Sequence, residues 1–170
     1  PYAVSKITQD YLGLQYFDSH KLKIVRVRPF NHTGPRQSHV FAIPSFAHQI
    51  AMLEKIGKGI LKVGDLSSQK DYTDVRDIVR AYLLALEKGE AGDVYNIGSG
   101  NLYKIEDILK KLLSFTKAQI KVEEDKDLIR KKEISKIVCN FSKFKEKTGW
   151  SPEITLTKTL FDTIEFERSL

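Results

Sequence analysis

The chain has 170 residues, of which 41% are hydrophobic and 29% charged, with a formal net charge of +6. This is the composition of a globular protein, and neither a membrane span nor a signal peptide is expected, because there is no apolar run of about 18 residues and no charged-then-apolar leader. The single cysteine, Cys139, excludes an internal disulfide and suits a reducing compartment. The basic charge allows an anionic partner, such as a nucleic acid or a phosphorylated small molecule.

Helical and strand patterns alternate along the chain. In chain order, they predict a helix over 2–19, a strand over 24–27, a helix over 40–57, a strand over 60–64, a helix over 75–88, a strand over 93–97, a helix over 104–115, strands over 118–125 and 135–140, and helices over 141–149 and 157–166. The clearest helix lies between Asp74, a capping residue, and Gly89, a terminating one. The alternation predicts an α/β fold.

The chain begins with PYAVSK, in which Tyr2 and Lys6 are one helical turn apart and so share a face of the first predicted helix. An ammonium beside a phenol favours the phenolate, so the two side chains can act together in proton transfer. The same spacing also fits a packed ring beside a solvated amine. Both interpretations stand at this point.

Other site motifs fail their spacing tests. The GSG at 98–100 lacks the third glycine of a dinucleotide loop, because position 103 is a tyrosine, and it is interpreted as a helix-entry turn. The histidines at 20, 32, 39 and 48 include no pair at the i, i+4 spacing of a helical zinc site, so no metal is expected. There is no aromatic and basic pattern of the RNA-binding kind, so no nucleic-acid partner is expected.

Five segments carry a resemblance to a known family. PYAVSK, RPFNHTGPRQ, VGDLSSQKDYTDVRDIVRAYLLALEKG, VYNIGSG and TGWSP occur in the order and spacing of extended short-chain dehydrogenases/reductases that act on nucleotide sugars. The resemblance covers nearly the whole chain. In that family the tyrosine and lysine follow an N-terminal half that carries the glycine-rich nucleotide loop. The chain therefore resembles the C-terminal half of such an enzyme and is expected to be inactive by itself.

The resemblance implies a Rossmann-type parallel-sheet domain interleaved with a smaller α/β substrate domain. Residues 1–32 and 72–98 would form the C-terminal part of the dinucleotide-binding domain. Residues 33–71 and 99–170 would form the nucleotide-sugar substrate domain.

The resemblance also implies residue roles. Tyr2 and Lys6 would be catalytic, and the contacts to an NADP or NAD cofactor would come from Tyr2, Lys6, Arg28, Pro29 and Asn31. The GDP-sugar substrate would contact Asn31, Val40, Phe41, Lys70 and Arg130. Lys70 departs from the arginine usual at its position, and lysine cannot make the planar two-point contact with a diphosphate. A solvated surface cation stays an alternative for both Lys70 and Arg130.

Among family members, the NHTGPRQ wording is most similar to those that reduce the 4-keto group of GDP-4-dehydro-6-deoxy-mannose. Dehydration of GDP-mannose, or the epimerisation or dehydration of another nucleotide sugar, is one alternative. A non-catalytic basic module that binds nucleotide sugars or nucleic acid is another. The full-length enzyme is expected to be cytoplasmic and homo-oligomeric. The choice between reductase and dehydratase depends on residues upstream of Tyr2.

Overall fold

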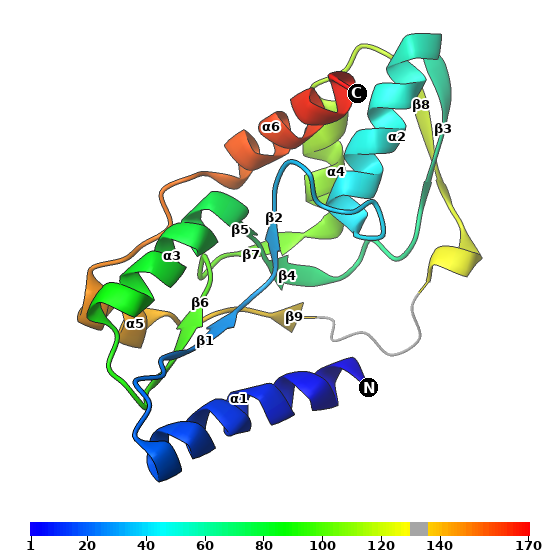
Figure 1. Ribbon diagram of the computed structural model, residues 1–170. Coiled ribbons are helices and arrows are strands. Elements are labelled where there is room, and N and C mark those ends of the chain that lie inside the picture. Colours follow the sequence, from blue (N-terminus) through cyan, green and yellow to red (C-terminus); the bar gives the residue numbers. More distant parts are fainter. Residues whose placement is uncertain (130–135) are drawn as a thin grey trace.

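The computed structural model describes residues 1–129 and 136–170 and has helices packed around several small sheets (Figure 1). The helices are α1 (Tyr2–His20), α2 (Ala42–Ile56), α3 (Val75–Lys88), α4 (Ile105–Leu113), α5 (Ser142–Thr148) and α6 (Leu156–Arg168), with one 3-10 turn, η1 (Lys126–Leu128). The strands are β1 (Arg26–Pro29), β2 (His32–Thr33), β3 (Lys58–Val63), β4 (Gln69–Asp71), β5 (Thr73–Asp74), β6 (Val94–Ile97), β7 (Leu102–Lys104), β8 (Gln119–Glu124) and β9 (Lys136–Ile137). The α/β class predicted from the sequence is confirmed.

Most strand pairs are parallel. β1 pairs with β6, β2 with β5 and β3 with β8 in parallel, whereas β4 lies between an antiparallel β7 and a parallel β9. In the β1–β6 pair, Arg26 lies opposite Val94 and Pro29 opposite Ile97, so the two strands end at the same edge. The segments that follow them, beginning at Asn31 and at the GSG turn, therefore leave the sheet side by side.

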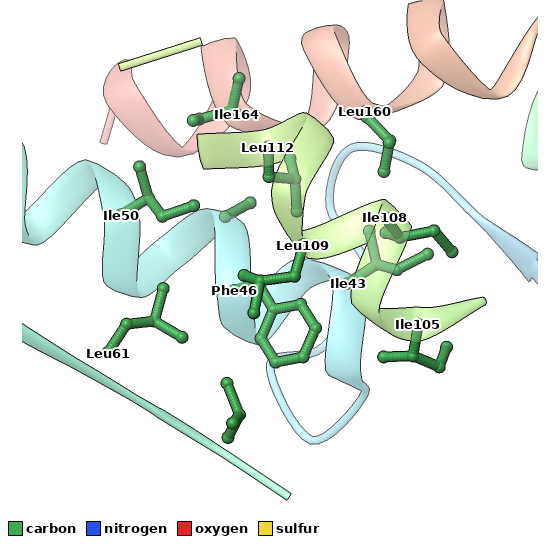
Figure 2. Close-up of a cluster of buried hydrophobic side chains, with 12 residues drawn as sticks. Ile43, Phe46, Ile50, Leu61, Ile105, Ile108, Leu109, Leu112, Leu160 and Ile164 are labelled. Atoms are coloured by element: carbon green, nitrogen blue, oxygen red, sulfur yellow. The ribbon is translucent and has the colours of Figure 1, made fainter. Parts of the chain in front are cut away.

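The larger hydrophobic core fills the space between α2, α4, α6 and β3. In Figure 2, side chains from these four elements point toward one another. The buried members are Ile43, Phe46, Ala47, Ile50, Leu61, Val63, Ile105, Ile108, Leu109, Leu112, Leu160 and Ile164. Each buried Leu, Ile or Phe stabilises the fold by roughly 1.5–3 kcal/mol relative to an exposed one. This cluster therefore fixes the position of α2.

A second core joins α3, β6 and α5. Its largest members are Tyr95, Phe144 and Trp150, all buried, with the Phe144 and Trp150 rings tilted and 5.7 Å apart. The Trp150 indole N–H donates to the carbonyl of Asp77 in α3 over 3.2 Å. The TGWSP motif is thus a packing unit that closes one end of α3.

Helix α1 stands apart from both cores (Figure 1). It matches the helix predicted over 2–19 to within one residue, but it buries no residue, and its apolar side chains Val4, Ile7 and Tyr11 are exposed. Its C-terminal half is held by Phe17, whose ring lies so close to Gly92 that a Cβ there would come within 2.3 Å of it. Gly92 has φ +86, which a glycine adopts without strain.

Helix α3 confirms its predicted caps but not the burial that its pattern suggests. The Asp74 side chain accepts from the Arg76 N–H at 2.8 Å, and Gly89 ends the helix. The buried side of α3, however, carries Asp77, Ile78, Ala81 and Ala85, of which the last three pack in the second core. Val79, Leu83 and Leu86, in contrast, face outward, with Leu86 at 80% exposure. Among the described residues, no helix has the length and apolar character needed to cross a membrane.

Candidate active site

The Tyr2 and Lys6 side chains meet on one face at the start of α1. The Lys6 ammonium lies 5.8 Å from the centre of the Tyr2 ring, and the Tyr2 residue is 76% exposed. Lys6 Nζ also donates a 3.3 Å hydrogen bond to Gln9 Oε1. The phenol and the amine are therefore paired and open to a ligand, as the spacing predicts, rather than packed into a core.

Asp10 connects this helix to β1. Arg28 Nη2 donates to Asp10 Oδ2 at 2.6 Å, and Arg26 Nη1 reaches the same oxygen at 3.4 Å. The hydrogen bond from Arg28 holds the pKa of Asp10 below its ordinary value. Arg28, expected at the cofactor, is thus engaged in an ion pair that aligns α1 with the strand. Its side chain stays half exposed.

Pro29 and Asn31 lie at the edge where β1 and β6 end. Pro29 closes the register opposite Ile97, and the Phe30 N–H donates to the Ile97 carbonyl at 2.8 Å. The Asn31 carbonyl accepts from the Thr73 N–H at 3.0 Å, while its residue is exposed. In open α/β sheets, ligands bind at the carboxyl ends of the strands. The structure therefore puts Asn31 where such a ligand would lie.

The NHTGPRQ segment folds into a compact turn ahead of α2. Thr33 Oγ1 donates to Gln37 Oε1 at 2.8 Å, and Gln37 Nε2 returns a bond to the His32 carbonyl at 3.1 Å. Val40 and Phe41, which the resemblance places near the substrate, come directly after this turn and are exposed. An apolar pair at the entrance of α2 can cover a planar base.

The KDYTDVRD segment is organised around three buried aspartates. Asp71 accepts four hydrogen bonds, from the Ser99 N–H (2.9 Å) and hydroxyl (2.6 Å), the Gly100 N–H (2.8 Å) and the Cys139 N–H (3.0 Å). Asp71 thereby ties the end of β4 to the GSG turn. That turn leads into β7 before α4 begins, so its interpretation as a direct helix entry was wrong.

The other two aspartates bind different parts of the chain. Asp74 accepts from the Thr159 hydroxyl at 2.7 Å, and Asp77 accepts from the Glu153 and Ile154 N–H groups at 3.0 and 2.9 Å. The aspartates of this segment therefore hold distant parts of the chain together. Sequence reasoning missed this role because each partner lies more than 70 residues away.

Lys70 is in β4, opposite Tyr103 and Ile137, and is half-buried. Arg130, expected at the diphosphate, lies outside the described residues. Cys139 is buried as expected of a small hydrophobe, and burial together with the charge of Asp71 raises the pKa of its thiol to about 12. A thiol held protonated is a poor nucleophile.

One group of polar side chains was missed by the sequence reasoning. His39, His48 and Glu167 come together although the sequence separates His48 and Glu167 by 119 positions. A search restricted to histidines four residues apart could not find them. The expectation that no metal binds therefore rested on too narrow a pattern.

Comparison with known proteins gives a consistent result. Residues 1–163 match the family model described as GDP-mannose 4,6 dehydratase. A GDP-6-deoxy-D-mannose reductase from Pseudomonas aeruginosa is 37% identical over 161 residues, which are 94% of this chain and 53% of that protein. The chain thus spans about half the length of the relatives it matches.

Solved structures agree in fold. The structure of RMD from Pseudomonas aeruginosa complexed with NADPH matches with a TM-score of 0.92 and 35% identity, over 99% of this chain and 56% of the other. A dTDP-glucose 4,6-dehydratase from Bacillus anthracis in complex with NAD matches with a TM-score of 0.80 and 28% identity, over 99% and 52%. The resemblance read from the motifs is confirmed: the chain belongs to the GDP-mannose 4,6 dehydratase family, within the extended short-chain dehydrogenases/reductases that act on nucleotide sugars.

Proposed function

We propose that this chain is the catalytic-tyrosine-bearing part of a reductase that converts the 4-keto group of GDP-4-dehydro-6-deoxy-mannose to a hydroxyl. The observation that carries the proposal is the exposed Tyr2–Lys6 pair at the start of α1. The 37% identity to a GDP-6-deoxy-D-mannose reductase supports the choice of substrate.

In this proposal Tyr2 donates its hydroxyl proton to the ketone oxygen of the sugar. The Lys6 ammonium stabilises the phenolate that remains, because an adjacent positive charge favours the ionised phenol. A nicotinamide cofactor, NADPH or NADH, would supply the hydride to the same carbon. The residues present fit such a cofactor, since Lys6 is exposed and an ammonium has three N–H groups, more than its single long bond to Gln9 uses.

For the substrate, we propose that Asn31, Val40, Phe41 and Lys70 line the GDP-sugar. Exposure of Val40 and Phe41 at the entrance of α2 suits contact with a base, and the position of Asn31 at the strand edge suits a sugar or diphosphate. We assign the same role to Arg130 on the resemblance. Nothing in the chemistry of these side chains requires a nucleic acid.

We also propose the division into a nucleotide domain, 1–32 and 72–98, and a substrate domain, 33–71 and 99–170. The two separate hydrophobic cores support this division. Residues 141–150 lie within the substrate-domain range but pack in the second core, with the nucleotide domain. The exposed apolar residues of α1, such as Ile7 and Tyr11, support assembly into a homo-oligomer. A reduced, buried Cys139 suits the cytoplasm.

The second candidate is a GDP-mannose dehydratase, favoured by the description of the matching family model. The same tyrosine and lysine would then serve a transient oxidation. Incubation of the natural full-length enzyme with each substrate separates the two activities. A reductase consumes NADPH when it is given the keto sugar, whereas a dehydratase converts GDP-mannose with no net consumption of the nicotinamide cofactor.

Tyr2→Phe in the full-length enzyme tests the proton-transfer role. The ring stays and only the hydroxyl is lost, so kcat is expected to fall about 10²-fold or more with little change in KM. Tyr16→Phe, on the exposed surface of the same helix, is the matched control and should be unaffected. Normal turnover in Tyr2→Phe would reject Tyr2 as the proton donor.

A further inference from the structure

Two histidines and a buried glutamate converge near the C-terminal end of α6. His39 precedes α2, His48 lies within α2, and Glu167 lies in the last turn of α6. His39 Nε2 is 3.0 Å from Glu167 Oε1, and His48 Nδ1 is 2.9 Å from Glu167 Oε2. Each carboxylate oxygen therefore faces its own ring nitrogen.

The burial of this cluster is uneven. The Glu167 side chain is 1% exposed, whereas those of His39 and His48 are 45% and 42% exposed. The adjacent Arg168 is directed elsewhere, to Glu54 and Glu165. Within the described part of the chain, the side-chain bonds made to Glu167 come from the two imidazoles. A buried carboxylate is costly without a compensating charge.

A divalent cation fits the three ligand atoms. All three lie within 4.8 Å of one another. A tetrahedral zinc ion with bonds of roughly 2.0–2.1 Å needs ligand atoms about 3.3 Å apart. The separations from His39 Nε2 to Oε1 and from His48 Nδ1 to Oε2, 3.0 and 2.9 Å, would have to open by a few tenths of an ångström. The remaining separations among the three ligand atoms are at most 4.8 Å and would have to close by up to about 1.5 Å. On binding, each ring would carry its proton on the nitrogen that faces away from the ion, so that a neutral imidazole supplies the lone pair of the nitrogen that now faces Glu167.

The two rings are stacked, with centres 4.2 Å apart and planes inclined by 21°. An imidazole binds a metal in the plane of its ring, so at least one of the half-exposed rings would have to rotate for both to bind one ion. Two imidazoles and one carboxylate are a known donor set for a three-ligand zinc site, whose fourth position holds water. The partial exposure of both rings leaves that position open to solvent.

We propose that His39, His48 and Glu167 bind a divalent transition-metal ion of the zinc class. The ion joins the segment before α2 to the end of α6. It thereby fixes the entrance of α2, where Val40 and Phe41 follow His39 directly. The site does not depend on the proposed enzymatic activity.

Metal binding to the natural full-length protein tests the proposal. Chelator-treated protein is titrated with Co²⁺, read by the visible absorption of the tetrahedral ion, and with Zn²⁺ by calorimetry. His39→Gln and His48→Gln keep an amide N–H that can still donate to Glu167, so the fold is retained while an imidazole ligand is lost. Each should weaken binding by about 100-fold or more, beyond the 10–100-fold that loss of a second-shell partner brings.

His20→Gln is the matched control, an exposed histidine on α1 outside the cluster. It should bind Co²⁺ and Zn²⁺ as the unmodified protein does. The melting temperature of unmodified protein and control should rise with Zn²⁺, and that of the two cluster variants should not. Absence of stoichiometric binding, or binding that survives either cluster substitution, would overturn the proposal.

Discussion

Asp71 is the most heavily bonded side chain of the KDYTDVRD segment, and its removal should loosen three parts of the chain at once. Asp71→Ala deprives the Ser99, Gly100 and Cys139 N–H groups of their acceptor. Hydrogen bonds to charged groups contribute about 1.5–3 kcal/mol each, but water can replace the carboxylate at the half-exposed Ser99 and Gly100. Only the Cys139 N–H is fully buried. The expected loss is therefore about 3–5 kcal/mol rather than the full sum.

Asp71→Asn should be milder, because its amide can be oriented to spare most of the bonds. Oδ2 accepts from Gly100 and Cys139, and Oδ1 accepts from Ser99. With the amide nitrogen at the Oδ1 position, only the Ser99 N–H loses its acceptor, since the Ser99 hydroxyl can rotate and accept instead. One unsatisfied donor costs about 1–3 kcal/mol.

Amide hydrogen exchange in the natural full-length protein measures this effect locally. A loss of about 3 kcal/mol corresponds to roughly 10²-fold faster exchange at residues 99, 100 and 139, since about 1.4 kcal/mol is tenfold in an equilibrium. Asp65→Ala, on the exposed loop after β3, is the control and should change little. Unchanged exchange at these amides, with less than about 1 kcal/mol lost in urea unfolding of Asp71→Ala, would refute the reasoning.

Two further substitutions probe the cores and their ties. Phe144→Ala should destabilise the protein by about 3–5 kcal/mol because that ring is fully buried. Phe161→Ala, at a residue 43% exposed, is the control and should cost far less. Equal losses of unfolding free energy in urea would contradict the assignment of the second core. Burial alone would raise the pKa of Asp74, but the hydrogen bonds from Arg76 and Thr159 outweigh it and lower the pKa. The stability that Asp74 contributes is then present above its ordinary pKa and lost as the pH falls through the lowered one. Asp74→Asn should be less stable than the unmodified protein at pH 7 by about 1–3 kcal/mol, with the difference shrinking toward pH 2; a difference independent of pH would exclude this linkage.

Local signals in the sequence were sufficient for much of the fold. Asp74 and Gly89 delimit α3 because a cap acts on its own helix, and Tyr2 and Lys6 meet because four residues make about one helical turn. Which face of α3 is buried was harder to predict from the sequence. A pattern of large apolar residues favours the face with Leu83 and Leu86, yet the structure buries the face with Ala81 and Ala85, which pack with Ile78 in the second core.

Contacts between segments far apart in the sequence could not be predicted. Which residue Asp71 binds depends on how β4, the GSG turn and the segment at Cys139 are brought together, and no local pattern encodes that. The same holds for His39 and Glu167, which are 128 positions apart. The family resemblance supplied residue roles at Tyr2 and Asn31 that spacing alone left open.

The way α1 is attached has a mechanical consequence for Tyr2. The ion pair at Asp10 and the contact of Phe17 with Gly92 hold the middle and the end of the helix. The first turns of α1 extend beyond these two contacts and bury no residue. Tyr2 lies eight positions before Asp10, a distance along the helix axis of about 12 Å at 1.5 Å per residue. A tilt of about 5° around Asp10 would displace Tyr2 by about 1 Å, and misplacements of that size can cost about 10²-fold in rate. In the proposed reaction, groups that contact the first turns of α1 would therefore affect the rate by positioning Tyr2, even without touching it.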